Sequence, residues 1–179
     1  MKIRLDKFQN RYVKKNVFLI VIWTIFHAVF FDTSIPWPSS FKRFLLILFG
    51  AKVGSKLVLK PRVTIKYPWN LFLGNNVWIG EKVWIDNLAK VEIKDNVCLS
   101  QGSLLLTGNH DYKKETFDLI VGEIILESGV WIGAKSIVCP SVTCHENSIL
   151  AVSSVATSDL KTNTIYQGNP ATIKRKRFD

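Results

Sequence analysis

The sequence predicts a mainly β protein: a parallel β-solenoid that follows a helical N-terminal segment and is interrupted by one long loop. Three observations predict this fold. After residue 50, aliphatic residues recur every six positions, a period that neither a helix nor an alternating strand has. In the best stretch of six, a small or β-branched residue stands four positions after each of the first five. The 179 residues are 47% apolar and 21% charged, as expected of one folded domain.

The first 50 residues are expected to be helical and to pack on the solenoid. Residues 17–31 are a nearly unbroken apolar run, and residues 32–38 contain helix breakers. Ser40 is expected to cap a second helix, whose apolar residues recur at three- and four-residue spacing: Phe41, Phe44, Leu45, Leu48 and Phe49. Gly50 then stands where the left-handed residue that ends a helix belongs.

The apolar run has three interpretations, and the sequence leaves them open. It is a buried or interfacial helix, a surface anchor strengthened by Lys42 and Arg43, or a membrane-spanning helix. The run is shorter than the roughly 18 residues that a spanning helix needs, and no signal-peptide cleavage site follows it. We therefore expect a cytoplasmic protein, which the anchor interpretation places at the inner face of the membrane.

Residues 51–179 are expected to form the solenoid and a basic C-terminal tail. The longest uninterrupted ladder is Leu126, Ile132, Val138, Cys144, Leu150 and Ala156. Shorter blocks precede it: Val53, Leu59 and Ile65; Leu73, Ile79 and Ile85; and Ile93, Leu99 and Leu105. A three-sided coil has room inside for one aliphatic residue per face and turn, which explains the period. Gly and Asn residues are expected to supply positive φ angles at the corners: Gly54, Gly74, Asn75, Asn76, Gly80, Asn96, Gly133 and Asn147.

The chain is strongly basic, with 24 Lys and Arg against 14 Asp and Glu and a net charge of +10. This excess indicates an anionic partner, which is a nucleic acid, an acidic membrane surface or a phosphorylated small molecule. No nucleic-acid recognition motif accompanies it, so we do not expect nucleic-acid binding. Cys98, Cys139 and Cys144 have no metal-binding spacing, and we expect them to be reduced and structural.

Only one of the three histidines stands where chemistry is expected. His27 lies within the apolar run and His145 at a solenoid corner, so both are expected to be packed or solvated. His110 lies in the loop at 107–123, where the six-residue rhythm stops. Long excursions from a regular scaffold commonly carry function. A zinc site would need three converging histidines, and His27 is too far along the chain from the others, so no metal is expected.

Several motifs resemble those of a known family. They are Leu-Phe-Gly-Ala-Lys-Val-Gly at 48–54, Ile-Lys-Tyr-Pro-Trp at 65–69, Ser-Gln-Gly at 100–102, Thr-Gly-Asn-His-Asp-Tyr at 107–112, Gly-Val-Trp-Ile-Gly at 129–133 and Gly-Asn-Pro-Ala at 168–171. Together they resemble the hexapeptide-repeat acyltransferases, which are left-handed β-helices. Within them, the chain is similar to O-acetyltransferases of the colanic acid biosynthesis type, relatives of the maltose and galactoside acetyltransferases. The left hand is implied by this resemblance.

The resemblance implies transfer of an acetyl group from acetyl-CoA to a sugar hydroxyl of a surface or exopolysaccharide precursor. His110 would be the general base, because imidazole exchanges protons near neutral pH. A backbone N–H near Gly133 or Ala134 would hold the tetrahedral oxyanion. No acyl-enzyme is needed, which agrees with structural cysteines. The relatives are homotrimers with sites between subunits, so a homotrimer is expected here.

Two sets of binding residues are expected, of which the resemblance implies the first, apart from Lys174, which the charge of the tail adds. Those expected to contact acetyl-CoA are Trp131, Gly133, Ala134, Ala151, Val152, Thr157 and, in the basic tail, Lys174. Those expected near the sugar acceptor are Tyr67, Asp86, Asn87, Gln101 and Asp111. Galactoside-type relatives hold the sugar with an asparagine whose place here falls near Gly80, so a different acceptor pocket is expected.

Two other functions stay open from the sequence. The same base and donor would serve an N-acetyltransferase that acts on a nucleotide-linked amino sugar. A non-catalytic, structural β-solenoid would use the same repeats without binding acetyl-CoA.

Overall fold

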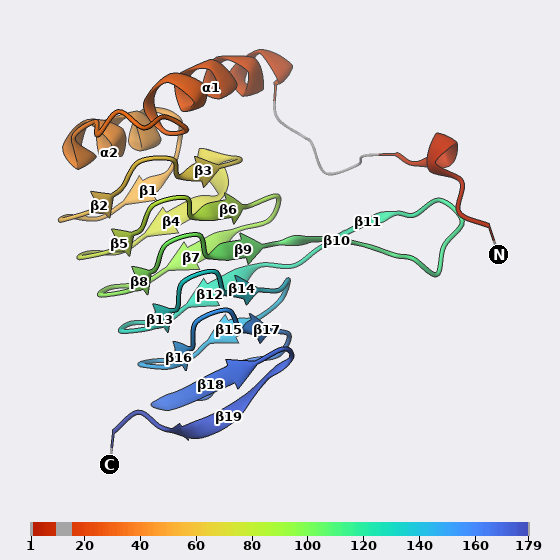
Figure 1. Cartoon of the computed structure of the whole chain (residues 1–179). Helices are drawn as coiled ribbons and strands as arrows, with labels where there is room; N and C mark the ends of the chain where they lie inside the picture. The colour runs from red at the N-terminus through yellow and green to blue at the C-terminus, as the bar shows by residue number, and fades with distance from the viewer. Residues whose placement is uncertain (1, 10–15, 179) are drawn as a thin grey trace.

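The computed structural model describes residues 2–9 and 16–178, which form a parallel β-solenoid capped by two helices, with a hairpin projecting from its side (Figure 1). The helices are α1 (Val17–Phe30) and α2 (Ser39–Leu48). Single 3₁₀ turns lie at Leu5–Lys7 and Pro68–Asn70. The helical prediction for the first 50 residues is therefore confirmed for α1, α2 and the short turn at Leu5–Lys7, and its positions 1 and 10–15 lie outside the described residues.

The strands stack in three columns, which we name faces A, B and C. Face A contains β1 (Lys52–Val53), β4 (Leu71–Leu73), β7 (Val91–Ile93), β12 (Ile124–Leu126) and β15 (Thr143–Cys144). Face B contains β2 (Val58–Leu59), β5 (Trp78–Ile79), β8 (Cys98–Leu99), β13 (Trp131–Ile132), β16 (Ile149–Leu150) and β18 (Thr164–Gly168), and it ends on the antiparallel β19 (Ala171–Lys176). Face C contains β3 (Thr64–Ile65), β6 (Trp84–Asp86), β9 (Leu104–Leu106), β14 (Ile137–Val138) and β17 (Val155–Ala156). The projecting hairpin is β10 (Gly108–His110) and β11 (Leu119–Val121).

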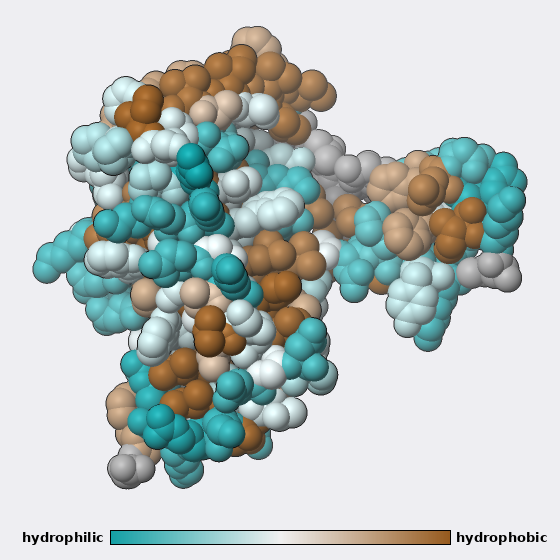
Figure 2. Space-filling model, viewed as in Figure 1, coloured by the Kyte–Doolittle hydropathy of each residue, from teal (hydrophilic) through white to brown (hydrophobic). Residues whose placement is uncertain are grey.

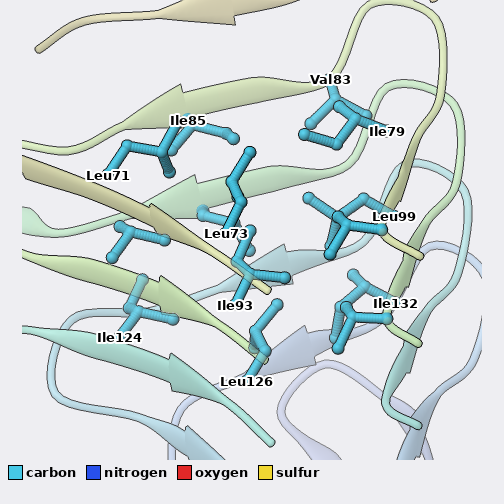
Figure 3. Close-up of a cluster of buried hydrophobic side chains, with 14 of the residues drawn as sticks. Leu71, Leu73, Ile79, Val83, Ile85, Ile93, Leu99, Ile124, Leu126 and Ile132 are labelled. Carbon is cyan, nitrogen blue, oxygen red and sulfur yellow. The ribbon is translucent and has the colours of Figure 1, made fainter. Parts of the chain in front are cut away.

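The six-residue ladder forms the core, as predicted. From Leu59 to Ala156, every ladder residue named above is at most 5% exposed. Equivalent residues of successive coils pair directly, for example Ile79 with Leu99 and Leu99 with Ile132 (Figure 3). Val53 is only partly buried. It belongs to the first coil, where α2 and not a preceding coil lies next to it.

The corner residues follow the prediction only in part. Asn76, Asn96 and Asn147 have the predicted positive φ angles, near +56° to +59°. Gly54, Gly74, Gly80 and Gly133 do not, and their small size serves another purpose. A Cβ atom at Gly133 would lie 2.6 Å from the backbone nitrogen of Val152 on the next coil. These glycines are therefore required for close stacking of coils rather than for chain reversal.

The two helices hydrogen-bond the exposed edge of the first coil. Lys42 is fully buried, and its Nζ donates to the carbonyls of Leu59 and Lys60 at 3.3 and 3.2 Å. The Arg43 guanidinium donates to the carbonyls of Val53 and Gly54. These contacts pair backbone groups that have no strand above them, and so protect a sheet edge that would otherwise attract another chain.

The start of α2 differs from the prediction. The helix begins at Ser39 after Pro38, and Ser40 does not cap it. The hydroxyl of Ser39 instead accepts a hydrogen bond from the backbone of Leu59, so the serine caps the solenoid edge rather than the helix. Gly50, with φ +93°, ends the helix as predicted. Among the described residues, no helix is long and apolar enough to span a membrane.

His27 makes the stability of this helical cap dependent on pH. Its Nε2 accepts a hydrogen bond from the Ile65 backbone at 3.1 Å, and burial lowers the pKa of His27 below its ordinary value, with nearby Asp32 opposing the shift. Below about pH 6.5 the unfolded chain therefore binds more protons than the folded one, and the free energy of unfolding falls as the pH falls. We expect His27→Gln to reduce the pH dependence of the free energy of unfolding between pH 5 and 8. Urea unfolding at fixed protein concentration measures it.

His145→Gln is the control, because the His145 side chain is 43% exposed. This variant is expected to keep the wild-type slope of the free energy of unfolding against pH. Equal slopes in both variants would show that His27 is not the group responsible.

Candidate active site

All insertions into the repeat fall at one corner of the solenoid, between faces C and A. Residues 66–70, 87–90 and 107–123 form three successive connections at this corner, and the third carries the β10–β11 hairpin. The loop predicted at 107–123 is thus an ordered hairpin that extends away from the solenoid (Figure 1). Beside it lies a cavity of about 410 Å³, lined by Phe8, Lys66, Tyr67, Asp86, Leu88, Leu106, Gly108, His110 and Leu119.

The His110 ring is held in one orientation. Its Nδ1 lies 2.9 Å from the carbonyl oxygen of Phe117 on the opposite side of the hairpin. A carbonyl only accepts, so Nδ1 carries the hydrogen, and the neutral ring keeps a free electron pair on Nε2. The ring also stacks on Phe117, with centroids 4.3 Å apart, and contacts Phe8 on the N-terminal segment. This geometry prepares His110 to accept a proton in the cavity.

The opposite wall of the cavity is polar and partly aromatic. Asp86 is 8% exposed, and its Oδ1 lies 2.8 Å from the Nζ of Lys66 on the preceding coil. Tyr67 stacks on Trp69 with ring centroids 4.9 Å apart. A second cavity, of about 320 Å³, shares Lys66, Tyr67 and Asp86 with the first and continues to α1 at Trp23 and His27. The two cavities therefore form a groove that runs from His110 to the helical cap.

The structure brings only part of the predicted acceptor set to this groove. Tyr67 and Asp86 line it. Asn87 is fully buried, and its side-chain amide exchanges two hydrogen bonds with the backbone of Tyr67, at 2.9 and 2.6 Å. Its polar atoms thus pair with the backbone of the preceding coil, as the backbone of a strand would, and do not face the cavity. Gln101 lies at a different corner, between faces B and C.

Asp111 follows His110 but, among the described residues, makes no hydrogen bond or ion pair with its ring. Its carboxylate accepts from the backbone of Lys113 at 3.1 Å and lies 3.9 Å from the Lys114 ammonium. The Phe117 carbonyl does the orienting instead. We therefore expect Asp111→Asn to lower the turnover number by less than about tenfold, far below the effect of losing a general base. A loss above about 10²-fold would mean that Asp111 acts in the reaction.

The residues predicted to contact the donor lie mainly on the other side of face C. Gly133 and Ala134, with Ala151 and Val152 one coil later, form the corner between faces B and C. Trp131 lies on face B, half exposed, and its Nε1 donates to Ser100. Thr157 follows β17, and Lys174 is exposed on β19. Gln101 shares this corner.

The backbone amides at this corner differ in availability. The N–H of Gly133 donates to the Leu150 carbonyl at 2.8 Å, and that of Ala151 donates to Tyr166. The N–H groups of Ala134 and Val152 have no hydrogen-bond acceptor in the part of the chain that the structure describes. Of the two residues predicted to hold an oxyanion, Ala134 is therefore the one whose amide is not already engaged in coil stacking.

Sequence reasoning missed three residues around His110: Phe8, Lys66 and Phe117. The spacing carried a signal for Lys66, because it stands 20 residues before Asp86, the same interval that separates Ile65 from Ile85. Residues at equal offsets in successive coils lie side by side. Phe8 and Phe117 had no such signal, since both reach the site through irregular segments.

The three cysteines are not poised for chemistry. Burial raises the pKa of the thiols of Cys98, Cys139 and Cys144 above the ordinary value. A thiol of raised pKa gives less of the nucleophilic thiolate. Within the described residues, no group of three or more His, Cys, Asp or Glu side chains is arranged to hold a metal ion.

Comparison with known proteins identifies the class. No model of a known protein family matches the chain. The chain is 32% identical to WcaF of Escherichia coli (strain K12), which is assigned as a colanic acid biosynthesis acetyltransferase, over 92% of this chain and 90% of that protein. A galactoside acetyltransferase in complex with coenzyme A has the same fold, with a TM-score of 0.81 at 23% identity over 91% of this chain and 82% of that one. A maltose O-acetyltransferase from Clostridium difficile 630 gives 0.75 at 21% identity, over 96% and 90%.

The fold is thus that of the solenoid acetyltransferases. The sequence similarity goes further than the fold, because it extends over nearly the full length of both proteins. The chain belongs to the hexapeptide-repeat acetyltransferase family, and it is an enzyme.

Proposed function

We propose that the protein transfers an acetyl group from acetyl-CoA to a hydroxyl group of a sugar, with His110 as the general base. The observation that carries the proposal is the hydrogen bond from His110 Nδ1 to the Phe117 carbonyl, which in the neutral ring puts the free electron pair on Nε2, in a side chain that lines a cavity of about 410 Å³. The acetyl donor is proposed from the family and from the galactoside acetyltransferase that was solved with coenzyme A.

In the proposed reaction, the sugar hydroxyl attacks the thioester carbonyl while Nε2 of His110 takes its proton. The tetrahedral oxyanion accepts a hydrogen bond from a backbone amide, for which we propose Ala134. The carbon–sulfur bond then breaks, and the imidazolium returns the proton to the leaving thiolate. The products are an acetyl ester and free coenzyme A. Phe117 holds the imidazole in the required tautomer throughout.

The acceptor is proposed to be a saccharide that belongs to a surface polysaccharide precursor. A tyrosine and a tryptophan stacked at the groove suit the apolar face of a sugar ring, and the Lys66–Asp86 pair offers both donors and acceptors to its hydroxyls. The name of WcaF favours an acceptor of the colanic acid type. The length of the groove, which continues to α1, favours an acceptor longer than one sugar.

We propose that the active site is completed by a second copy of the chain in a homotrimer. His110 and the Ala134 corner lie at opposite edges of face C, so one chain does not bring them to the same cavity. Outward-facing apolar side chains cover faces B and C and would favour association through them: Val58, Trp78, Trp131, Trp84, Leu104 and Ile137. Light scattering is expected to give three times the chain mass of 20.4 kDa. A mass of one chain would contradict the shared site.

A panel of acceptors tests the function. Purified protein is incubated with acetyl-CoA and either neutral sugars and oligosaccharides or nucleotide-linked amino sugars, and the release of free thiol is measured. We expect turnover with hydroxyl acceptors. Turnover confined to amino sugars would establish the N-acetyltransferase alternative, and the absence of coenzyme A binding by calorimetry would establish a non-catalytic solenoid.

A further inference from the structure

The outer surface of the helical cap is apolar and has no partner among residues 2–9 and 16–178. The inner side of α1 packs on the core through Leu19, Ile22, Trp23, Phe26 and Phe30. Its outer side exposes Val17, Phe18, Val21, Ile25 and Val29, and α2 adds Phe44, Ile47 and Leu48. These eight side chains, which we name the cap surface, are 42–70% exposed. Figure 2 shows the apolar band that covers the helices at the end of the molecule.

Cations also gather at this end of the molecule. Residues 16–70 contain seven Lys and Arg against one Asp, whereas residues 71–163 contain seven basic and 11 acidic residues. The first coil, directly below the helices, carries five exposed cations and no acidic residue: Lys52, Lys56, Lys60, Arg62 and Lys66. Arg62 also donates to Ser34 in the α1–α2 connection, so this cation reaches the helical cap itself.

We propose that the cap surface docks on a membrane that contains anionic lipids. An apolar helix face bordered by Lys and Arg is the arrangement that binds the lipid interface, where aliphatic side chains enter the acyl region and cations meet the headgroups. A helix of 14 residues is about 21 Å long, shorter than the ~30 Å hydrocarbon core, so α1 lies along the interface.

The composition of the cap surface favours lipid over a protein partner. Protein interfaces combine apolar contacts with about one hydrogen bond per 100–200 Å². The one hydroxyl on the outer side of α1, that of Thr24, already donates to the Ile20 carbonyl at 2.8 Å. The cap surface also lies at the end of the solenoid, whereas the proposed trimer contacts lie along its sides, so three copies would present it in the same direction.

Vesicle flotation tests the proposal with matched variants. The probes are vesicles of phosphatidylcholine alone and of phosphatidylcholine with phosphatidylglycerol. Ile25→Ser with Phe44→Ser removes two side chains of the cap surface, each 59% exposed. Ile173→Ser with Phe178→Ser is the control at the opposite end, where the exposures are 56% and 55%. A third double variant, Lys56→Gln with Lys60→Gln, reduces the positive charge at the cap. Its control is Lys135→Gln with Lys161→Gln, which removes the same charge elsewhere.

We expect the wild-type protein to float with the anionic vesicles, and the apolar cap variant to lose at least about tenfold in partitioning. The lysine cap variant is expected to bind less at low salt, and both controls to bind like the wild type. All variants should acetylate a soluble acceptor at the wild-type rate, which separates this test from that of the proposed function. Wild-type protein that binds neither vesicle, or equal losses in cap and control variants, would overturn the proposal. The proposal would also be overturned if light scattering gave twice the mass of the expected assembly and only the apolar cap variant abolished this doubling. A second copy would then cover the cap surface.

Discussion

Replacing His110 with alanine is expected to lower the turnover number by about 10²–10⁴-fold while the dissociation constant for coenzyme A stays within about twofold. The loss follows because the described lining of the cavity holds no second imidazole: its other polar side chains are Lys66 and Asp86, which are paired with each other, and Tyr67. Donor affinity is kept because the proposed donor residues lie at another corner of the solenoid. Steady-state kinetics and calorimetry measure the two quantities.

His145→Ala serves as the control, because this second imidazole lies at a corner of the coil beside Glu127 and away from the cavity. It is expected to keep wild-type turnover. If His110→Ala retained full activity, the histidine would have no role as base and the mechanism would be wrong. If coenzyme A binding disappeared with it, His110 would serve the donor rather than the proton transfer.

Removal of one rung of the ladder is expected to have the largest effect on stability. Leu126 points inward from β12 and is fully buried between Ile93 and Cys144 of the neighbouring coils. Leu126→Ala deletes three carbons in a core that cannot collapse, because the coils above and below fix its spacing. We expect a loss of about 2–5 kcal/mol in the free energy of unfolding, measured with urea at constant protein concentration.

The adjacent residue provides the comparison. Ile125 points outward from the same strand on face A, away from the faces proposed to associate. Ile125→Ala is expected to cost below about 1 kcal/mol. Similar losses for the two variants would contradict the assignment of inward and outward positions on which the solenoid core rests.

The solenoid could be predicted because its constraint repeats along the sequence. Each inward position has neighbours above and below at a fixed distance, so residues such as Leu99 and Ile132 must be aliphatic, and the six-residue period records this directly. The reason for Gly133 was not visible in the same way. Gly133 must be small because Val152 on the next coil lies against it. In a sequence, a glycine required for space cannot be distinguished from one required for its φ angle.

The helical cap shows a second limit of sequence reasoning. Phe44 and Leu48 fit the helical spacing of Leu45 and Phe49, yet the first two are exposed and the last two are buried. Spacing alone does not tell which side of α2 meets the core, because apolar residues lie on both sides of it. That choice depends on the edge of the first coil, where Lys42 and Arg43 must reach unpaired carbonyls.

The candidate site was predictable to the extent that side-chain chemistry defines it. His110 was chosen as the candidate base because a histidine in the one long excursion stands out. Its orienting partner was not, because a backbone carbonyl leaves no trace in the sequence, and the position of Phe117 depends on the pairing of β10 with β11. The pairing of Asn87 with the Tyr67 backbone could not be predicted for a related reason, since its amide replaces backbone groups that only the folded coil reveals.

The central claim, that His110 transfers protons between an acceptor hydroxyl and a thioester, is tested most directly by a crystal structure of the assembled protein with coenzyme A. We expect the thiol sulfur within roughly 3.5 Å of His110 Nε2, with the pantetheine arm along the Ala134 and Val152 corner of a neighbouring chain. A coenzyme bound far from every copy of His110 would contradict the account.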